Sequence, residues 1–205
     1  MNDSKLAELA RLIDAWPGLV SAPAQELVDD CLVLVPHLAE ASTLVDVGSG
    51  GGLPGLPLKI MVPRLEVTLV EADGRKAAFL TQACASLGLA GVRVVGRRAE
   101  DAAHDPGLRE SFDVAVARAL APMPVLAELC LPFVRVGGRL LAQKTRDEDI
   151  GSAARAIQLL GGAPARVEPA PSRARSAGVV VAVEKVAPTP ATYPRRAGVP
   201  SRRPL

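Results

Sequence analysis

VDVGSGGGLPG, residues 45–55, is the stretch of sequence that decides the fold. An apolar, β-branched run enters it, four glycines follow within five positions, and a helical pattern begins near residue 56. Glycine permits a positive φ and lets a ligand approach the backbone closely. Because the turn lies between a strand and a helix, we expect it to bind a ligand rather than simply to connect two elements.

Outward from this turn, apolar strands alternate with helical patterns. Near-continuous apolar strands between helices indicate a mostly parallel sheet with helices on both faces. Only a loop separates the last two strands, so this pair is predicted to be antiparallel. The fold class is therefore α/β, with a Rossmann-like, seven-stranded sheet. Strands are predicted over residues 43–48, 66–72, 92–97, 112–117, 138–144, 165–169 and 178–186, and helices near residues 56–62, 74–88, 123–134 and 147–160.

The chain divides into three parts. Two predicted helices, over residues 5–16 and 23–39, precede the first strand, and periodicity ends after Val186. We therefore expect a helical region over residues 1–40, a sheet domain over 41–187 and a basic Pro/Arg tail over 188–205. The tail is predicted to be extended, because Pro and Arg dominate it.

Composition narrows the class of protein. The chain has 205 residues, 49% hydrophobic and 22% charged, which favours one globular domain with small additions. Aromatic residues make up only 2%, so a module that reads several bases by stacking is disfavoured. The start of the chain is mixed in charge and no apolar run is long enough to cross a bilayer, so we expect a cytoplasmic protein without a membrane segment.

Cysteine and histidine are sparse. Cys31, Cys84 and Cys130 are far apart in apolar surroundings, and we expect them to be buried without disulfides. His37 and His104 have no companions at ligand spacing, so no metal site is expected. Of the 24 basic residues, four lie in residues 190–205. The rest of the chain has 20 basic residues and the sequence has 22 acidic residues, none of them in residues 190–205. The positive charge is therefore concentrated in the tail.

The glycine turn itself fits two kinds of cofactor. Gly50, Gly52 and Gly55 have the spacing of a dinucleotide site, so a nicotinamide-dependent oxidoreductase is one reading. Asp46, two residues before Gly48, suits the cationic end of a methionine moiety and would crowd a pyrophosphate. The sheet also uses nearly the whole chain and leaves no room for a dehydrogenase substrate domain. These two points favour S-adenosylmethionine.

Three further positions are expected at the same edge of the sheet. Glu71 ends the second strand, where a carboxylate can accept hydrogen bonds from ribose hydroxyls of either cofactor. RRAED, residues 97–101, follows the third strand and would flank the adenine of a methyltransferase of this architecture. Arg118 follows the fourth strand, at the carboxyl edge where open α/β sheets bind ligands. The charges of RRAED alone would favour a solvated loop, whereas the position of Arg118 alone favours the site over an ordinary surface charge.

What the sequence lacks indicates the target atom. The fourth strand is followed by Ala-Arg-Ala-Leu-Ala-Pro rather than by the Pro-Pro-aromatic motif common in exocyclic-amine methylation, and no cysteine stands in a convincing nucleophile motif. No base suited to a hydroxyl target is evident. A ring nitrogen with a free lone pair, such as guanine N7, needs none of these groups. Alignment alone can lower such a barrier by about 7–11 kcal/mol.

The motifs of this sequence match those of a known family. The chain resembles the glucose-inhibited division protein B family, the 16S rRNA guanine-N7 methyltransferases, over roughly residues 26–205. The Leu-Pro-Gly-Leu-Pro continuation of the turn and the Pro-Arg tail are more specific than the glycines alone. The matching stretches are DVGSGGGLPGLPL (46–58), VTLVEADGRKAAFL (67–80), RRAED (97–101), ARALAP (117–122), GGRLLAQK (137–144) and YPRRAGVPSRRPL (193–205).

The resemblance implies a class I methyltransferase that uses S-adenosylmethionine, a methyltransferase domain over 41–187, and one target guanine in a 16S rRNA hairpin loop near the decoding centre. The expected partner is the small ribosomal subunit or its assembly intermediates, and we expect a monomer. With the positions argued above, the expected cofactor contacts are Asp46, Gly48, Gly50, Gly52, Leu53, Glu71, Ala99, Glu100 and Arg118. Arg118 and Lys144 are the catalytic candidates. RNA contacts are expected from Lys144, Arg195, Arg196, Arg202 and Arg203, and the tail is expected to act on RNA without affecting the cofactor.

Three alternatives remain open. The first is a methyltransferase that acts on a small molecule or a protein. The second is a non-catalytic, cofactor-binding protein associated with the ribosome, since Glu26-Leu27 stands where the family has Arg-His. The third is the oxidoreductase.

Overall fold

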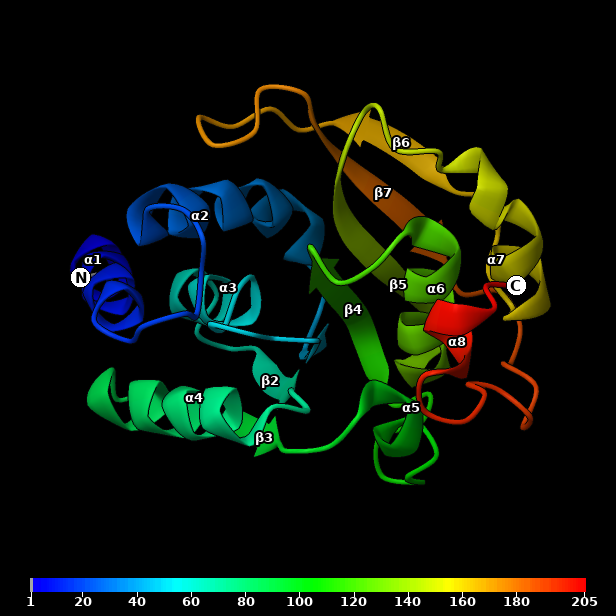
Figure 1. Ribbon diagram of the computed structural model, residues 1–205, viewed down its shortest axis with the longest axis horizontal. Coiled ribbons are helices and arrows are strands. Elements are labelled where there is room, and N and C mark those ends of the chain that lie inside the picture. Colours follow the sequence, from blue (N-terminus) through cyan, green and yellow to red (C-terminus); the bar gives the residue numbers. More distant parts are fainter. Residues whose placement is uncertain (1) are drawn as a thin grey trace.

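One seven-stranded sheet organises the computed structural model, which describes residues 2–205 (Figure 1). The strand order is β3-β2-β1-β4-β5-β7-β6. Pairs from β3 through β5 are parallel, while β7 runs antiparallel to both β5 and β6. The predicted α/β class and the antiparallel end of the sheet are thus confirmed. The strands are β1 (Thr43–Val47), β2 (Glu66–Val70), β3 (Val92–Val95), β4 (Phe112–Arg118), β5 (Val134–Thr145), β6 (Arg166–Pro169) and β7 (Gly178–Glu184).

Helices cover both faces of the sheet (Figure 1). In the view of Figure 1, the helices from α1 to α4 lie on the left and those from α5 to α8 on the right. The α-helices are α1 (Asn2–Asp14), α2 (Ala24–Cys31), α3 (Gly55–Met61), α4 (Gly74–Ser86), α5 (Ala99–Ala102), α6 (Met123–Cys130), α7 (Ala154–Leu159) and α8 (Val199–Arg202). Three 3-10 helices, η1 (Leu32–Leu38), η2 (Leu131–Phe133) and η3 (Gly151–Ala153), adjoin α2, α6 and α7.

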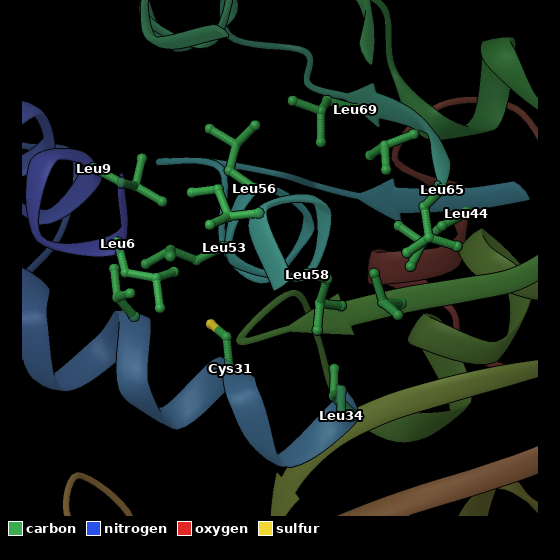
Figure 2. Packing of buried hydrophobic residues seen from close by; sticks show 14 of the residues in the cluster. Leu6, Leu9, Cys31, Leu34, Leu44, Leu53, Leu56, Leu58, Leu65 and Leu69 are labelled. Carbon is green, nitrogen blue, oxygen red and sulfur yellow. The ribbon is translucent and has the colours of Figure 1, made fainter. Parts of the chain in front are cut away.

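Each central strand is apolar on both faces because each face is covered. In β1, Leu44 packs into the cluster under α1–α4, whereas Val45 and Val47 pack into the cluster under α5–α7. Figure 2 shows the first cluster, where Leu6 and Leu9 of α1 and Cys31 lie with the leucines of the glycine turn and α3. This two-sided burial is why the sequence reads as unbroken apolar runs rather than as alternation.

The second predicted helix, 23–39, is in fact two elements. The α-helix α2 ends at Cys31, and the following turns are the 3-10 helix η1, which contains Pro36. Proline has no N–H to donate to the carbonyl four residues earlier, and its ring crowds that carbonyl. The short helices α5 and α8 were not expected, because four residues are too few to show a helical period.

Residues of the amino-terminal region belong to the same apolar cluster as the sheet. Leu9 of α1 and Val28 of α2 are fully buried with Leu44 of β1 and Val116 of β4. The region therefore covers one face of the sheet. Among residues 2–205, no helix has the length and apolarity required to cross a membrane.

The tail is not extended, which corrects the expectation from its composition. It folds back over α6 and ends in α8 (Figure 1). The Arg109 guanidinium donates to the carbonyls of Thr189 and Tyr193, both at 2.8 Å. Arg195 forms an ion pair with Glu128 of α6, with 2.6 Å between Arg195 Nη2 and Glu128 Oε2. These contacts satisfy charges that the sequence pattern could not pair.

We expect Arg195→Ala to destabilise the fold. The Glu128 carboxylate is fully buried and accepts four hydrogen bonds from Arg195, one of them from its backbone N–H. Removal of the guanidinium leaves this buried charge without its counter-ion, at a cost of about 2–4 kcal/mol in the free energy of unfolding. Urea unfolding measures the loss. Arg196→Ala, one residue away on an exposed side chain, is the matched control and should cost less than about 0.5 kcal/mol; equal losses would contradict the assignment.

Candidate functional site

A pocket of about 350 Å³ lies at the carboxyl ends of β1, β2 and β4. Its floor is the glycine turn after β1, and its walls come from the segments after β2, β3 and β4. The chain moves outward from β1 in one direction through β3 and then returns to β4 on the other side of β1. Ligands of open α/β sheets bind at such a switch point. The volume lies within the range of small-molecule sites.

Two carboxylates fix the glycine turn. The Gly50 N–H donates to Glu71 Oε2 at 2.8 Å, and the Gly55 N–H donates to Asp46 Oδ2 at 2.8 Å. Gly50 has φ 53, and a Cβ there would meet nothing nearer than 3.9 Å, so the turn is open on that side. A Cβ on Gly55 would lie 2.6 Å from Leu69 Cδ2, so α3 starts in close contact with the sheet. The loop is thus shaped to leave space for a ligand.

Asp46 lies beneath the turn rather than in the wall of the pocket. Its side chain is fully buried, and Oδ1 has no hydrogen-bond partner within residues 2–205. Burial raises the pKa of Asp46 to about 7, although the Gly55 N–H opposes this, and the charge of Glu71 raises it further. The expected direct contact between Asp46 and a cofactor therefore stays a prediction, and the structure gives Asp46 a role in holding Gly55.

Glu100 is a buried carboxylate that lines the pocket. Its Oε1 accepts the N–H of Gly198 at 2.8 Å and a hydrogen bond from Arg98 Nη2 at 3.2 Å. Burial would raise the pKa of Glu100, but these hydrogen bonds and the Arg98 charge outweigh it and hold the pKa below its ordinary value. The tail thus contacts a residue that lines the pocket, which the sequence analysis did not expect.

Arg118 ends β4 and lines the pocket on the side opposite Glu71 and Glu100 along the sheet. Its Nε donates to Asp30 Oδ2 at 3.2 Å, and Asp30 is fully buried at the end of α2. The next residue, Ala119, has φ 50, a conformation that few residues other than glycine adopt. This sharp turn after β4 directs the chain around the pocket.

Most of the predicted cofactor contacts meet at this pocket. Asp46 and Gly52 do not line it. Lys144 does not line it either: the side chain is buried, and Nζ donates to the Ala121 carbonyl at 2.5 Å and to Glu148 at 2.7 Å. The predicted residues that line the pocket are Gly48, Gly50, Leu53, Glu71, Ala99, Glu100 and Arg118.

The predicted RNA contacts separate into two groups. Arg195 is engaged by the buried Glu128, and its side chain is only 26% exposed, so it anchors the tail. Arg196, Arg202 and Arg203 are exposed. Within residues 2–205, no group of three His, Cys, Asp or Glu side chains could hold a metal ion.

Sequence reasoning missed several residues of the site. Leu19 and Val20, between α1 and α2, close the pocket from the amino-terminal side, and Lys76 of α4 joins its rim. The sequence analysis did not single out Asp30, which lies near the end of α2 and contacts Arg118. No local pattern marks these residues, because their role depends on which segments meet in space.

The donor set of this pocket fits S-adenosylmethionine. The glycine turn is open, two carboxylates flank one side, and Arg118 stands on the other. Seven strands in this order, with the pocket after β1, define the class I S-adenosylmethionine-dependent methyltransferase fold. Solved structures agree with it. The chain superposes on an O-methyltransferase from Bacillus cereus in complex with SAH with a TM-score of 0.62, 19% identity, and 89% of this chain and 91% of that chain covered.

A second structure, the O-methyltransferase TomG from Streptomyces achromogenes in complex with SAM, matches with a TM-score of 0.61 and 20% identity, over 89% of this chain and 90% of that chain. The family itself follows from sequence. The family model "rRNA small subunit methyltransferase G" matches residues 20–176. The chain therefore belongs to the rRNA small subunit methyltransferase G family.

Individual relatives support the same family membership. The ribosomal RNA small subunit methyltransferase G of Roseiflexus sp. is 49% identical over 166 residues, which cover 80% of this chain and 71% of that protein. The protein of the same name from Moorella thermoacetica is 45% identical over 177 residues, covering 85% of this chain and 74% of that protein. The oxidoreductase alternative is thereby excluded.

We expect Asp46→Asn to change how stability depends on pH. The pKa of about 7 in the folded protein lies above the ordinary value of 3.8, so the folded state binds this proton more tightly than the unfolded chain. Wild-type stability from this group therefore falls as pH rises between those two values. The variant lacks this equilibrium.

Relative to the wild type, the free energy of unfolding of Asp46→Asn should thus rise by on the order of 2 kcal/mol between about pH 5 and about pH 8. Urea unfolding of both proteins at the two pH values measures the change. A difference that stays constant with pH would show that Asp46 is ionised throughout.

Proposed function

We propose that this protein transfers the methyl group of S-adenosylmethionine to N7 of a guanine in 16S rRNA, in a hairpin loop near the decoding centre. Membership of the rRNA small subunit methyltransferase G family carries this proposal. The pocket at the switch point of the sheet supplies a place for the cofactor. Bound S-adenosylmethionine provides an activated methyl group on a sulfonium centre.

The residues of the pocket suggest how the cofactor is oriented. Glu71 and Glu100 are both hydrogen-bonded to backbone N–H groups, and their remaining lone pairs suit the hydroxyl and amine donors of an adenosine. Arg118 lies at the other end, where its guanidinium suits a carboxylate. Opposite charges at the two ends of one pocket would fix a ligand that carries donors at one end and an anion at the other.

The chemistry of the walls supports a ring nitrogen as the target. The acidic residues that line the pocket, within residues 2–205, are Glu71 and Glu100, and both accept hydrogen bonds already. No cysteine of this described part lines it. Guanine N7 bears no proton, so its methylation needs alignment and exclusion of water rather than a base. Leu19, Val20 and Leu120 supply an apolar wall for a planar base.

The exposed arginines of the tail support RNA as the substrate. Arg196, Arg202 and Arg203 lie on either side of Gly198, the residue that contacts Glu100. The segment that carries them therefore contacts a residue of the pocket. Arginines in this position suit phosphate groups, and each contact adds about 0.7–0.9 to the slope of affinity against salt.

Several expectations from the sequence complete the proposal. The protein acts on the small ribosomal subunit or its assembly intermediates, in the cytoplasm, as a monomer and without a metal ion. Residues 1–40 form a helical region, 41–187 the methyltransferase domain and 188–205 the tail. Asp46 and Gly52 were expected to contact the cofactor, and we propose that Asp46 instead holds the loop through the Gly55 N–H. Lys144, expected to be catalytic or to contact RNA, holds the segment after β4 through the Ala121 carbonyl.

Mass mapping of 16S rRNA tests the function directly. The gene is deleted and then restored as the wild type or as Arg118→Ala, and RNase fragments are compared for one methylated guanine. We expect the mark to be absent in the deletion strain and restored by the wild type only. In vitro, label from tritiated cofactor in a protein or metabolite but not in 30S RNA would favour a different methyltransferase. Tight cofactor binding without turnover would favour the non-catalytic alternative.

Arg118→Ala is expected to weaken cofactor binding or turnover at least about tenfold, because a charge-assisted hydrogen bond contributes about 1.5–3 kcal/mol. Calorimetry with SAH and steady-state kinetics measure the loss. Arg139→Ala, on the same sheet but outside the pocket lining, is the control. Unchanged constants for Arg118→Ala would remove this residue from the site.

A triple substitution of Arg196, Arg202 and Arg203 by Ala is expected to weaken RNA binding and to reduce the salt slope by about two to three. Filter binding at several salt concentrations measures both. The fold should persist, because these side chains are exposed.

The control for the triple variant removes the same charge elsewhere. Arg11, Arg155 and Arg166 are exposed on α1, α7 and β6, away from the pocket. Their replacement by Ala should leave the salt slope nearly unchanged. The same loss from both triple variants would mean that net charge, rather than the rim beside the pocket, governs RNA binding.

A further inference from the structure

Asp30 joins segments that are far apart in the sequence. Its carboxylate accepts hydrogen bonds from Arg118 at the end of β4 and from Ser172 and Arg175, which lie between β6 and β7. The Ser172 Oγ–Asp30 Oδ1 distance is 2.5 Å, and the distances from Arg175 to the carboxylate are 3.1–3.2 Å. Gln143 of β5 donates to the Asp30 backbone carbonyl at 2.9 Å. The end of α2 is thereby hydrogen-bonded to β4, to β5 and to the loop between β6 and β7.

The cluster has two guanidinium groups and one carboxylate, and the two arginines differ in what they leave free. Arg175 uses Nε and Nη2 on Asp30 and Nη1 on the Lys144 carbonyl. Arg118 uses only Nε, and within residues 2–205 its two Nη atoms make no hydrogen bond. Arg118 also lines the pocket, whereas Arg175 does not. The unused donors of Arg118 are thus the ones available to a ligand.

An arginine side chain has four rotatable bonds, so a free guanidinium at a pocket rim samples many positions. Here, one edge of the Arg118 guanidinium is held by a carboxylate that is itself fully buried and held by Ser172 and Arg175. The Arg118 side chain is only 18% exposed. The folded protein therefore already restricts the Arg118 side chain, so that less conformational entropy is lost when a ligand binds.

We propose that Asp30 is the positioning residue for Arg118, and that it holds the guanidinium so that both Nη atoms face the pocket and bind the carboxylate end of the cofactor. Asp30 itself does not contact the ligand. The inference rests on the proposed function, since it assigns Arg118 to cofactor binding. Through Arg118, it gives Asp30 and the amino-terminal region that carries it an indirect part in cofactor binding.

A double-mutant cycle tests the proposal in the full-length protein. Asp30→Asn keeps the size of the side chain and removes its charge, and we expect the Kd for SAH to rise roughly five- to thirtyfold. In the Arg118→Ala background, the same change should raise Kd by less than about twofold, because its effect passes through Arg118. Losses that multiply, or an unchanged Kd for Asp30→Asn alone, would overturn the proposal.

The matched control is Asp113→Asn. Asp113 lies at the other end of β4 and accepts hydrogen bonds from the backbone N–H groups of Ser42 and Thr43 and from Arg135. Its replacement should lower thermal stability as much as Asp30→Asn does and leave the Kd for SAH unchanged. If Asp113→Asn weakens SAH binding equally, Asp30 acts on stability alone.

A second measurement needs no variant of Asp30. In the wild-type protein labelled with ¹⁵N-arginine, the Arg118 Nε–H resonance, assigned by its absence in Arg118→Ala, should be rigid both without SAH and with it. A mobile Nε–H without SAH that becomes rigid with SAH would overturn the proposal. Failure of the wild type to methylate 30S RNA would instead count against the proposed function and leave this result standing.

Discussion

The pocket depends on backbone N–H groups that two carboxylates hold in place. Gly50 and Gly55 lie in one turn, and each donates to a carboxylate at the end of a different strand, Glu71 after β2 and Asp46 in β1. These hydrogen bonds fix the turn to neighbouring strands of a parallel sheet. Because β1 and β2 are paired with each other, the floor of the pocket is anchored to two neighbouring strands. A turn of four glycines would otherwise sample many conformations, at an entropic cost that binding would have to overcome.

Segments near both ends of the chain contribute to the pocket at the edge of the sheet. On one side, Leu19 and Val20 close the pocket and Asp30 contacts Arg118. On the other, the tail brings the N–H of Gly198 to Glu100. The sheet supplies the floor and the carboxyl ends of the strands, and the peripheral helices supply the groups that hold the ligand-facing side chains. The fold is shared with methyltransferases that are under 25% identical, and the family model matches residues 20–176, which include Asp30 and Arg118.

Periodicity and glycine spacing predicted the sheet and the position of the turn, and the family resemblance added Leu53, Ala99 and Glu100 to the residues expected around the pocket. These features are local: a buried strand needs an apolar run, and a tight turn needs glycine. The ion pairs could not be predicted in the same way. Arg195 reads as a free charge in a Pro-Arg tail, yet its partner Glu128 is 67 residues away in sequence. Asp46 reads as a ligand contact by its place at the strand end, yet its carboxylate faces Gly55. The sequence lists the charged residues, but the partner of each one depends on how the folded chain packs.

The docking of the tail has a consequence for the order in which ligands act. One short segment presents arginines to solvent and, through the Gly198 backbone, contacts the carboxylate of Glu100. Any nucleic acid that shifts α8 also changes the free energy of that contact. If that change alters the affinity of the pocket for the cofactor, thermodynamic reciprocity requires that a bound cofactor alter the affinity of the segment for nucleic acid by the same factor. The hydrogen bond between Gly198 and Glu100 is thus the contact through which two chemically unrelated ligands would influence each other.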